Sequence, residues 1–282
     1  MSDGFVVKPL KCGHCGHELP VMGQFVTFRC DTCLKYWVLT AVGLKPVTVY
    51  RTLLPEEAGA EPVYLPFWII EMDKAAFRRR IEEVMSGLKV TAQTILQTAV
   101  QADDDAFEID RLEQPDLDIG LIKARFVSEA GRTNRLLTSS ESSYLHRRIE
   151  GDGPYYIYVP SFLSYNTYAY LKVGKLLTRA QPAFRTEKSA GLGKPVLCAL
   201  QADEALALID FIFFATLPES IQSNDDFLKS IRLDPVGAPY LVEFPFERRG
   251  ATLLSLIGNF TISSRLVEGL TPTSSSPAGS HA

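Results

Sequence analysis

Cys12-Gly-His-Cys15 and Cys30-Asp-Thr-Cys33 are two Cys-x-x-Cys pairs near the beginning of the chain, and fourteen residues separate them. This spacing allows two short hairpin turns to close over one tetrahedral metal ion. The four thiolates Cys12, Cys15, Cys30 and Cys33 therefore predict a structural Zn²⁺ site. Short alternating segments at 21–28 and 36–40 flank the pairs and predict β-hairpin strands.

The turn around each cysteine pair favours a positive φ at the residue that follows the second cysteine. Gly16 occupies this position in the first pair and adopts such a φ freely. Leu34 occupies it in the second pair, where its side chain meets a steric penalty, so we expect the second turn to be less regular. His14 and His17 are alternative ligands, but with four cysteines present we expect both to be exposed turn residues. A redox-active Cys-x-x-Cys is the other alternative, disfavoured because neither pair has strand–helix context.

Cys12, Cys15-Gly16, Cys30 and Cys33, followed by Tyr36-Trp37, resemble the zinc ribbon, a family of small β modules. Such modules occur in transcription factors, replication proteins and many bacterial proteins of unknown function. The resemblance covers less than a fifth of the chain and implies a β fold and a zinc ion, but no particular activity. The whole plan, a ribbon followed by Leu-Pro-Phe-Trp (65–68) and Tyr-Val-Pro-Ser-Phe (158–162), is similar to bacterial zinc-ribbon proteins of unknown function.

The rest of the chain predicts an α+β protein, with one or two mixed α+β domains after the ribbon. The ribbon is assigned to residues 1–53, and a linker rich in proline and acids follows it. Gly151-Asp152-Gly153-Pro154 marks a second break, which divides the remainder into α+β domains at 63–150 and 154–270. Residues 271–282 are rich in Ser, Pro and Thr and are expected to be a disordered tail.

Hydrophobic periodicity predicts the elements of these domains. Helices are expected from Asp73, over 166–179 and over 202–217, and strands over 63–70, 118–128, 155–162, 240–246 and 251–262. Pro66 lacks an amide proton and favours an edge or a bulge for its strand. Proline followed closely by an aromatic residue recurs at Pro66, Pro160 and Pro245, which indicates either a duplicated unit or chance.

Composition limits the function classes. The chain has 282 residues, 46% of them hydrophobic and 22% charged, with a net charge of −4, so it has no overall positive field for polyanions. The start lacks a signal-peptide pattern and no apolar run is long enough for a transmembrane segment. Four of the five cysteines have metal-ligand spacing, which predicts a reducing, cytoplasmic location. The fifth, Cys198, lies in an apolar run and is predicted to be a small buried hydrophobic residue.

Three function classes stay open. A non-enzymatic protein interaction or assembly module is favoured, whose partner is either an unknown protein or a second copy of the chain. Nucleic-acid binding is the alternative, but residues 1–50 hold five Lys/Arg and three acids, so a zinc-loaded ribbon is close to neutral. The best basic clusters are Arg78-Arg79-Arg80 and Arg147-Arg148, which surface ion pairs also explain. An enzyme of unrecognised class is the second alternative, since six tyrosines lie between 155 and 170, although packing explains them better. No catalytic residue and no cofactor-binding residue other than the zinc ligands is predicted.

Overall fold

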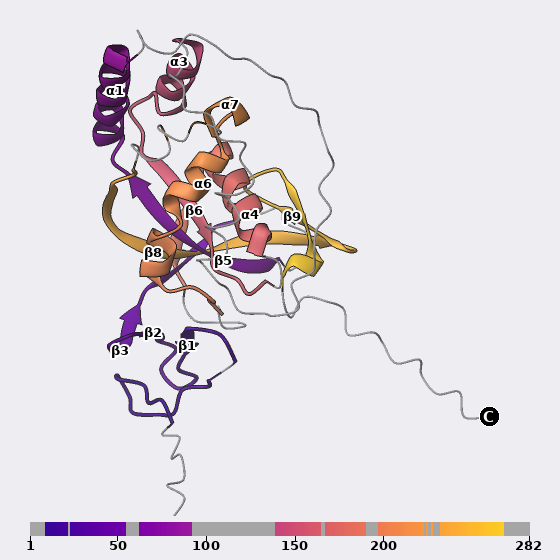
Figure 1. Cartoon of the computed structure of the whole chain (residues 1–282). Coiled ribbons are helices and arrows are strands. Elements are labelled where there is room, and N and C mark those ends of the chain that lie inside the picture. Colours follow the sequence, from indigo (N-terminus) through magenta and orange to yellow (C-terminus); the bar gives the residue numbers. More distant parts are fainter. Residues whose placement is uncertain are drawn as a thin grey trace, which may run out of the picture.

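The computed structural model describes residues 9–21, 23–54, 62–91, 139–164, 167–189, 197–222, 224, 227 and 232–267. Within these ranges the chain forms a three-stranded antiparallel sheet, a seven-stranded mixed sheet and several helices (Figure 1). This confirms the predicted α+β class. The predicted strand at 118–128 and the predicted tail at 271–282 lie outside the described residues.

The small sheet carries the N-terminal ribbon. Its strands, in the order β1-β2-β3, are β1 (Thr27–Arg29), β2 (Tyr36–Thr40) and β3 (Gly43–Val47). The predicted strand at 36–40 is confirmed. Of the strand predicted over 21–28, only Thr27 and Phe28 are in a strand, as the first two residues of β1. A turn at Gly23, with φ of 50°, precedes it and ends the extended backbone.

The large sheet is organised around one long strand, β8. The strands are β4 (Val49–Thr52), β5 (Val63–Met72), β6 (Tyr155–Pro160), β7 (Thr186–Lys188), β8 (Pro235–Arg249), β9 (Thr252–Ser255) and β10 (Thr261–Ser263). Strand β8 runs antiparallel to β5 and β9 and parallel to β4, while β6 pairs with the other side of β5. The strand predicted over 251–262 is two strands, because a turn containing Asn259 at φ of 49° separates them.

Strands from all three sequence segments meet in this sheet. β4 comes from the predicted ribbon range, β5 from the second segment, and β6 and β8 from the third. The three strands that carry Pro66, Pro160 and Pro245 are direct neighbours in the order β6-β5-β8. The division into separate domains at 1–53, 63–150 and 154–270 stays a prediction.

Pro66 does not lie on an edge strand, and that expectation is wrong. β5 is paired on both sides, and its register irregularity falls between Ile69 and Glu71 rather than at Pro66. The Pro66 carbonyl accepts a hydrogen bond of 2.9 Å from the Ser161 amide, just beyond the end of β6. In an antiparallel strand the N–H and C=O of a residue point to the same side. The missing N–H therefore faces a place where the β5–β6 ladder has already ended.

The helices are α1 (Lys74–Thr91), α3 (Ser139–Arg148), α4 (Thr167–Ala180), α5 (Ala202–Leu206), α6 (Ile209–Ala215), α7 (Glu219–Gln222) and the 3₁₀ turn η1 (Ser264–Leu266). The predicted start at Asp73 is confirmed, since its carboxylate accepts a hydrogen bond of 2.8 Å from the Ala76 amide. The single helix predicted over 202–217 is wrong. The helix is interrupted at Leu208, whose amide donates to the Ala205 carbonyl three residues earlier. This tighter turn separates α5 from α6, which begins at Ile209.

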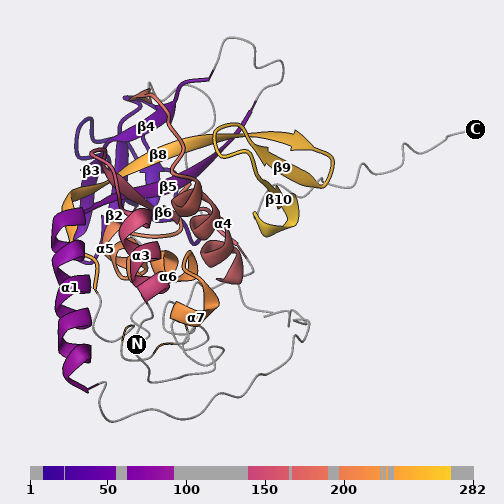
Figure 2. The ribbon, with the colours of Figure 1, turned by 90° about the horizontal axis from the view of Figure 1, so that it is seen from above.

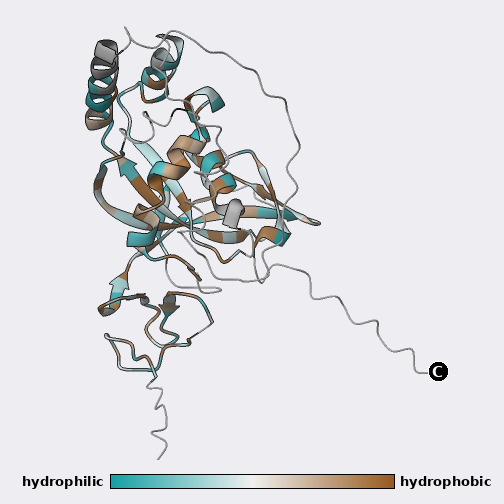
Figure 3. Cartoon of the chain, in the orientation of Figure 1, coloured by the Kyte–Doolittle hydropathy of each residue, from teal (hydrophilic) through white to brown (hydrophobic). Residues whose placement is uncertain are grey.

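The core lies on both faces of the large sheet because successive side chains of a strand alternate between faces. On one face Trp68 packs in a cluster with Phe77 of α1, Leu145 of α3 and Phe213 of α6. Figure 2 shows these helices gathered beside the sheet, and Figure 3 shows apolar colour concentrated on α6 and the central strands. On the other face Phe67 packs with Phe244, Phe246, Tyr158 and α4 side chains. None of the helices in the described part of the chain combines the length and apolarity that crossing a bilayer requires.

The open edge of β6 is covered by the C-terminal end of α4. The Gln181 side chain accepts a hydrogen bond of 3.0 Å from the Tyr156 amide and donates bonds of 2.7 Å to the Tyr156 carbonyl and 2.8 Å to the Thr178 carbonyl. The Thr178 hydroxyl accepts from the Tyr158 amide at 3.1 Å. Gln181 has φ of 44°, which is unfavourable for a residue with a side chain. These bonds occupy edge groups that would otherwise be available to another strand.

We expect Gln181→Ala to destabilise the protein by about 1–3 kcal/mol, because it leaves the Tyr156 backbone groups without their partner while the φ penalty stays the same. Gln181→Gly is the control. It also loses the side chain but relieves the backbone, so its loss should be smaller. Urea unfolding and hydrogen exchange of the Tyr156 amide measure both effects. Equal stability of Gln181→Ala and the parent protein contradicts this role.

Candidate metal centre

The two cysteine pairs form turns with the same hydrogen-bond pattern. In the first, the Cys12 amide donates to the His17 carbonyl at 2.7 Å and the Gly16 amide donates to the Cys12 carbonyl at 2.9 Å. In the second, the Cys30 amide donates to the Lys35 carbonyl at 2.9 Å and the Leu34 amide donates to the Cys30 carbonyl at 2.8 Å. Each turn thus fixes its two sulfurs in the same way.

Leu34 adopts the backbone conformation of a glycine. Its φ is 58° and that of Gly16 is 77°, so both turns use the left-handed region after the second cysteine. The expectation of a less regular second turn is wrong. Leu34 accepts a penalty of roughly 1–2 kcal/mol, which the two backbone hydrogen bonds of the turn help to offset.

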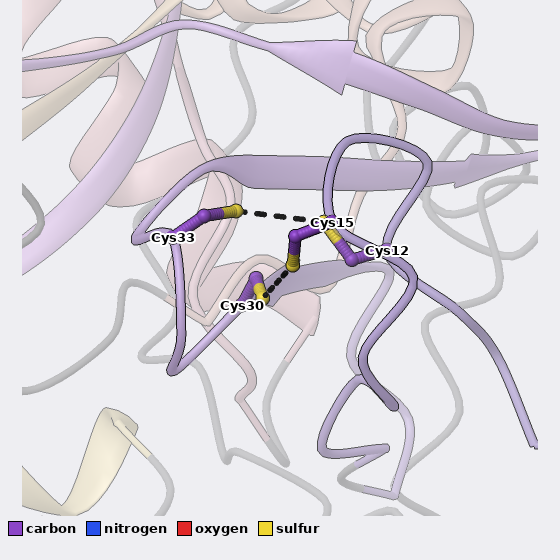
Figure 4. Close-up of side chains that lie close together, drawn as sticks. All are labelled: Cys12, Cys15, Cys30 and Cys33. Atoms are coloured by element: carbon purple, nitrogen blue, oxygen red, sulfur yellow. Dashed lines mark hydrogen bonds between the residues drawn. The ribbon is translucent and has the colours of Figure 1, made fainter.

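The four sulfurs lie close enough to hold one metal ion. Cys12 and Cys33 sulfurs are 3.5 Å apart, Cys15 and Cys30 sulfurs are 3.4 Å apart, and all four lie within 4.8 Å of one another. Figure 4 shows them converging from the two turns. Cys12 and Cys30 are buried, with 2% and 0% exposure, while the other two are partly exposed.

The Trp37 ring of β2 packs against Gly13 in the first cysteine turn. A Cβ atom on Gly13 would lie 2.6 Å from the Trp37 ring, so only glycine allows the ring to approach this closely. Trp37 belongs to a small core with Phe28 and Leu19 and the two buried cysteines. The aromatic residue after the second pair thus packs behind the cysteine cluster and supports the first turn.

The side chains of the other sequence-predicted residues do not belong to the sulfur cluster. His14 and His17 are exposed, as expected, and His14 Nδ1 lies 3.1 Å from the Lys35 amine. Cys198 is completely buried, as expected for a small hydrophobe, and burial raises the pKa of its thiol to about 12.

Without a metal ion the four thiols differ in acidity. Burial raises the pKa of Cys12, but backbone hydrogen bonds, led by the Cys15 amide, lower it to about 6. A bond from the His17 amide lowers the pKa of Cys15, but burial and neighbouring sulfurs raise it to about 12. In the second pair, burial raises the pKa of Cys30 and the Cys33 amide lowers it, with a net lowering. A backbone bond lowers the pKa of Cys33, but burial and neighbouring sulfurs give a net increase.

A metal ion that binds all four sulfurs must displace the protons that the two weakly acidic thiols retain. We therefore expect metal binding to release protons near neutral pH and the apparent affinity to fall as the pH is lowered. Calorimetric titration with Zn²⁺ in buffers of different ionisation enthalpy measures the release. An affinity that does not change between acidic and neutral pH contradicts ligation by these thiols.

The two turn positions provide a matched pair of substitutions. Gly16→Ala should destabilise the first turn by about 1 kcal/mol, because a φ of 77° strains any side chain although nothing lies within 4 Å of the added Cβ atom. Leu34→Gly relieves the same strain in the second turn and should not reduce stability in the same way. Thermal unfolding of both variants tests this contrast, and a loss of the same size for both contradicts it.

The chain matches no known protein-family model, no curated protein and no solved structure. The zinc-ribbon resemblance therefore stands on the residues and geometry of the cysteine turns alone.

The sequence did not predict a second site, a buried ion pair between Glu243 and Arg51. Glu243 of β8 is 1% exposed, and its carboxylate accepts hydrogen bonds of 2.7 Å and 3.2 Å from the Arg51 guanidinium. The Arg51 guanidinium also lies 4.3 Å from the centre of the Tyr64 ring. The available signal was a single acid within the apolar run Tyr240–Phe246. Because a buried charge needs a partner, such an acid predicts a cation nearby but does not reveal which one.

The basic clusters that the sequence singled out contact the rest of the fold. Arg78 donates to the Ile149 carbonyl at 2.8 Å, and Arg148 donates to the Thr178 carbonyl at 3.1 Å. Arg80 pairs with Asp234 at 2.8 Å. A shallow cleft beside α1 and α3 combines basic and acidic groups, lined by Arg78, Ser143, His146, Arg147, Glu150, Gly151 and Asp152.

Proposed function

We propose that the chain binds one structural Zn²⁺ ion through Cys12, Cys15, Cys30 and Cys33 and acts as a non-enzymatic protein interaction or assembly module. The observation that carries the zinc assignment is the mutual distance of the four sulfurs. Tetrahedral Zn–S bonds of about 2.3 Å place sulfurs about 3.8 Å apart. The closest sulfur pairs, at 3.4 Å and 3.5 Å, lie near this value.

The donor set supports a structural rather than a catalytic metal. Four thiolates select soft or borderline ions, and they leave no coordination position for water or substrate. All five described cysteines are free thiols, which fits a reducing compartment and supports the cytoplasmic location that we propose.

Cobalt substitution tests the metal proposal. The full-length protein, stripped of metal and titrated with Co²⁺, should develop the visible absorption of tetrahedral thiolate-bound cobalt, saturate at one ion per chain and lose the signal when Zn²⁺ is added. Cys198→Ser is the matched control and should titrate like the parent protein, whereas Cys33→Ser should not. Octahedral cobalt spectra, or saturation at no defined ratio, contradict the assignment.

Support for an interaction role comes from tyrosine side chains of β4, β6 and β8, which pack at the border of the core cluster that contains Phe67. Tyr50, Tyr156 and Tyr240 are half-buried, and their rings meet edge to face, with centroids 6.1 Å apart for Tyr50–Tyr240 and 6.4 Å apart for Tyr156–Tyr240. Tyrosine offers apolar area and a hydroxyl group at low entropic cost, and it is enriched at protein interfaces.

The interaction proposal is tested by affinity capture of the tagged protein with and without nuclease, beside light scattering of the protein alone. A partner, or a second copy, should bind after nuclease treatment and should be lost in the double variant Tyr50→Ser/Tyr240→Ser. Arg265→Ser, an exposed substitution elsewhere, is the control. Capture that nuclease abolishes, or that the tyrosine variant leaves unchanged, contradicts the proposal.

Nucleic-acid binding remains the alternative, and the internal contacts of Arg78, Arg80 and Arg148 count against it. Phosphate binding requires guanidinium groups that are available to the ligand. An enzyme is the second alternative. Burial raises the pKa of Tyr155 to about 12 and raises that of Tyr158 further, which disfavours these phenols as acids at neutral pH.

A further inference from the structure

Strand β1 connects the metal centre to the large sheet. It ends at Arg29, and the next residue is the buried Cys30. At its beginning, the Val26 amide donates to the Cys198 carbonyl at 2.7 Å, and the Thr27 hydroxyl accepts from the Cys198 amide at 2.8 Å. Both Thr27 and Cys198 have no exposed surface. The strand that leads into the second cysteine turn is therefore hydrogen-bonded to, and buried against, the rest of the described fold. We call this remainder, the large sheet with its helices and the segment of Cys198, the body.

Strand β2 makes the apolar part of the same contact. Tyr36 begins this strand three residues after Cys33, is 5% exposed and belongs to the core cluster that contains Trp68 and Leu241 of the large sheet. Val26 and Val47 pack against that cluster as well. Residues on both sides of the second cysteine turn thus contribute to the core of the body.

Arg29 of β1 also interacts electrostatically with a buried ion pair of the large sheet. Glu243 is buried, and burial raises the pKa of its carboxyl group, while the paired Arg51 and, more weakly, Arg29 of β1 lower it. The Arg29 side chain is itself only 11% exposed. Arg29, which directly precedes Cys30, thus lies within electrostatic range of the buried Arg51–Glu243 pair.

We propose that the metal site is a latch that holds residues 11–47 of the ribbon against Cys198 and this apolar core, and that metal loss releases these residues while the large sheet and its helices stay folded. This inference rests on the proposed metal binding. The ribbon's own core is small, and small domains of this kind need a metal to stay folded. Once both cysteine turns open, β1 and β2 lose the geometry that docks Thr27 and Tyr36. The body retains the β5–β6 and β5–β8 ladders, in which the ribbon takes no part.

Cys198 is the reporter for this release, because β1 covers it and it lies outside the sulfur cluster. The full-length protein is treated with iodoacetamide with Zn²⁺ or with a chelator, and labelling of the Cys198 peptide is followed by mass spectrometry. Metal content and hydrogen exchange of β5 and β6 are measured in the same samples. We expect labelling to be at least roughly tenfold faster after chelation, with β5 and β6 still protected.

Thr27→Val tests the contact without touching the metal ligands. It removes the hydroxyl that receives the Cys198 amide, so labelling should accelerate by roughly threefold or more in the zinc-loaded protein. Thr252→Val, whose hydroxyl donates to the Arg249 carbonyl at an exposed turn, is the control and should have no effect on labelling.

Two results overturn the latch. Cys198 that stays equally protected after the metal is gone shows that the ribbon remains docked without it. Loss of β5 and β6 protection together with Cys198 protection shows that the metal stabilises the whole fold rather than the docked ribbon. Protein that never binds metal refutes the proposed function itself, and the metal measurement identifies that case separately.

Discussion

We expect Cys30→Ser to abolish the proposed metal binding and to lower the temperature at which the ribbon unfolds in the full-length chain by about 10 °C or more, while the large sheet keeps its own transition. Cys30 is completely buried, belongs to the small ribbon core and ends the strand that docks on the body. Its loss therefore removes a ligand and the contacts that depend on the second cysteine turn. Loss of a structural metal belongs to the few single-residue effects that exceed about 4 kcal/mol, and in a small unit such as the ribbon this corresponds to a shift of at least this size.

The matched control is Cys198→Ser, the same chemical change at an equally buried cysteine outside the cluster. It should cost about 1 kcal/mol and leave one metal ion per chain. Calorimetric melts and metal analysis of both variants make the comparison. Equal melting temperatures for the two variants would show that the metal site contributes no special stability.

Arg51→Met destabilises the protein by about 3–5 kcal/mol at neutral pH, because it leaves Glu243 as an uncompensated buried charge. The Arg51 side chain is 24% exposed and that of Glu243 2%, and their closest N–O distance is 2.7 Å. The defect should depend on pH. Burial already raises the pKa of Glu243, and removal of Arg51 raises it further, so the folded variant binds a proton more tightly than the unfolded chain. Its stability is then lost as the pH rises from the ordinary carboxyl range through the raised pKa.

Arg249→Met is the control for this ion pair. Arg249 and Glu247 have the same closest N–O distance, 2.7 Å, but their side chains are 60% and 32% exposed. Exposed pairs contribute little, so urea unfolding should detect no clear loss. A defect of Arg51→Met that is equal at pH 5 and pH 7.5 contradicts the assignment of the charge to Glu243.

The elements that sequence predicted best are those with strong local signals. The spacing of the cysteine pairs predicted that their four sulfurs converge, and the capping residue Asp73 predicted the start of α1. The break at Leu208 was not visible, because an apolar residue there fits a continuous helix as well as a tight turn. Likewise, the φ of Leu34 could not be expected from propensity, since the turn's hydrogen bonds override the residue's own preference.

Contacts between residues far apart in sequence were the other features that could not be predicted. Arg51 and Glu243 are far apart in sequence, and only the parallel pairing of β4 with β8 places them opposite each other. Local periodicity carries no information about which strands become neighbours. The same limit hid the contact of Thr27 with Cys198, which joins the ribbon to the body.

The most direct test of the account is native mass spectrometry of the full-length protein expressed in zinc-supplemented medium, beside the Cys12→Ser variant. We expect one zinc ion per chain in the parent protein and none in the variant. The mass of the zinc-bound protein should equal that of the metal-free chain plus zinc, minus the protons that the thiols release. A folded parent protein without metal, or a variant that retains the ion, would contradict ligation by the four cysteines.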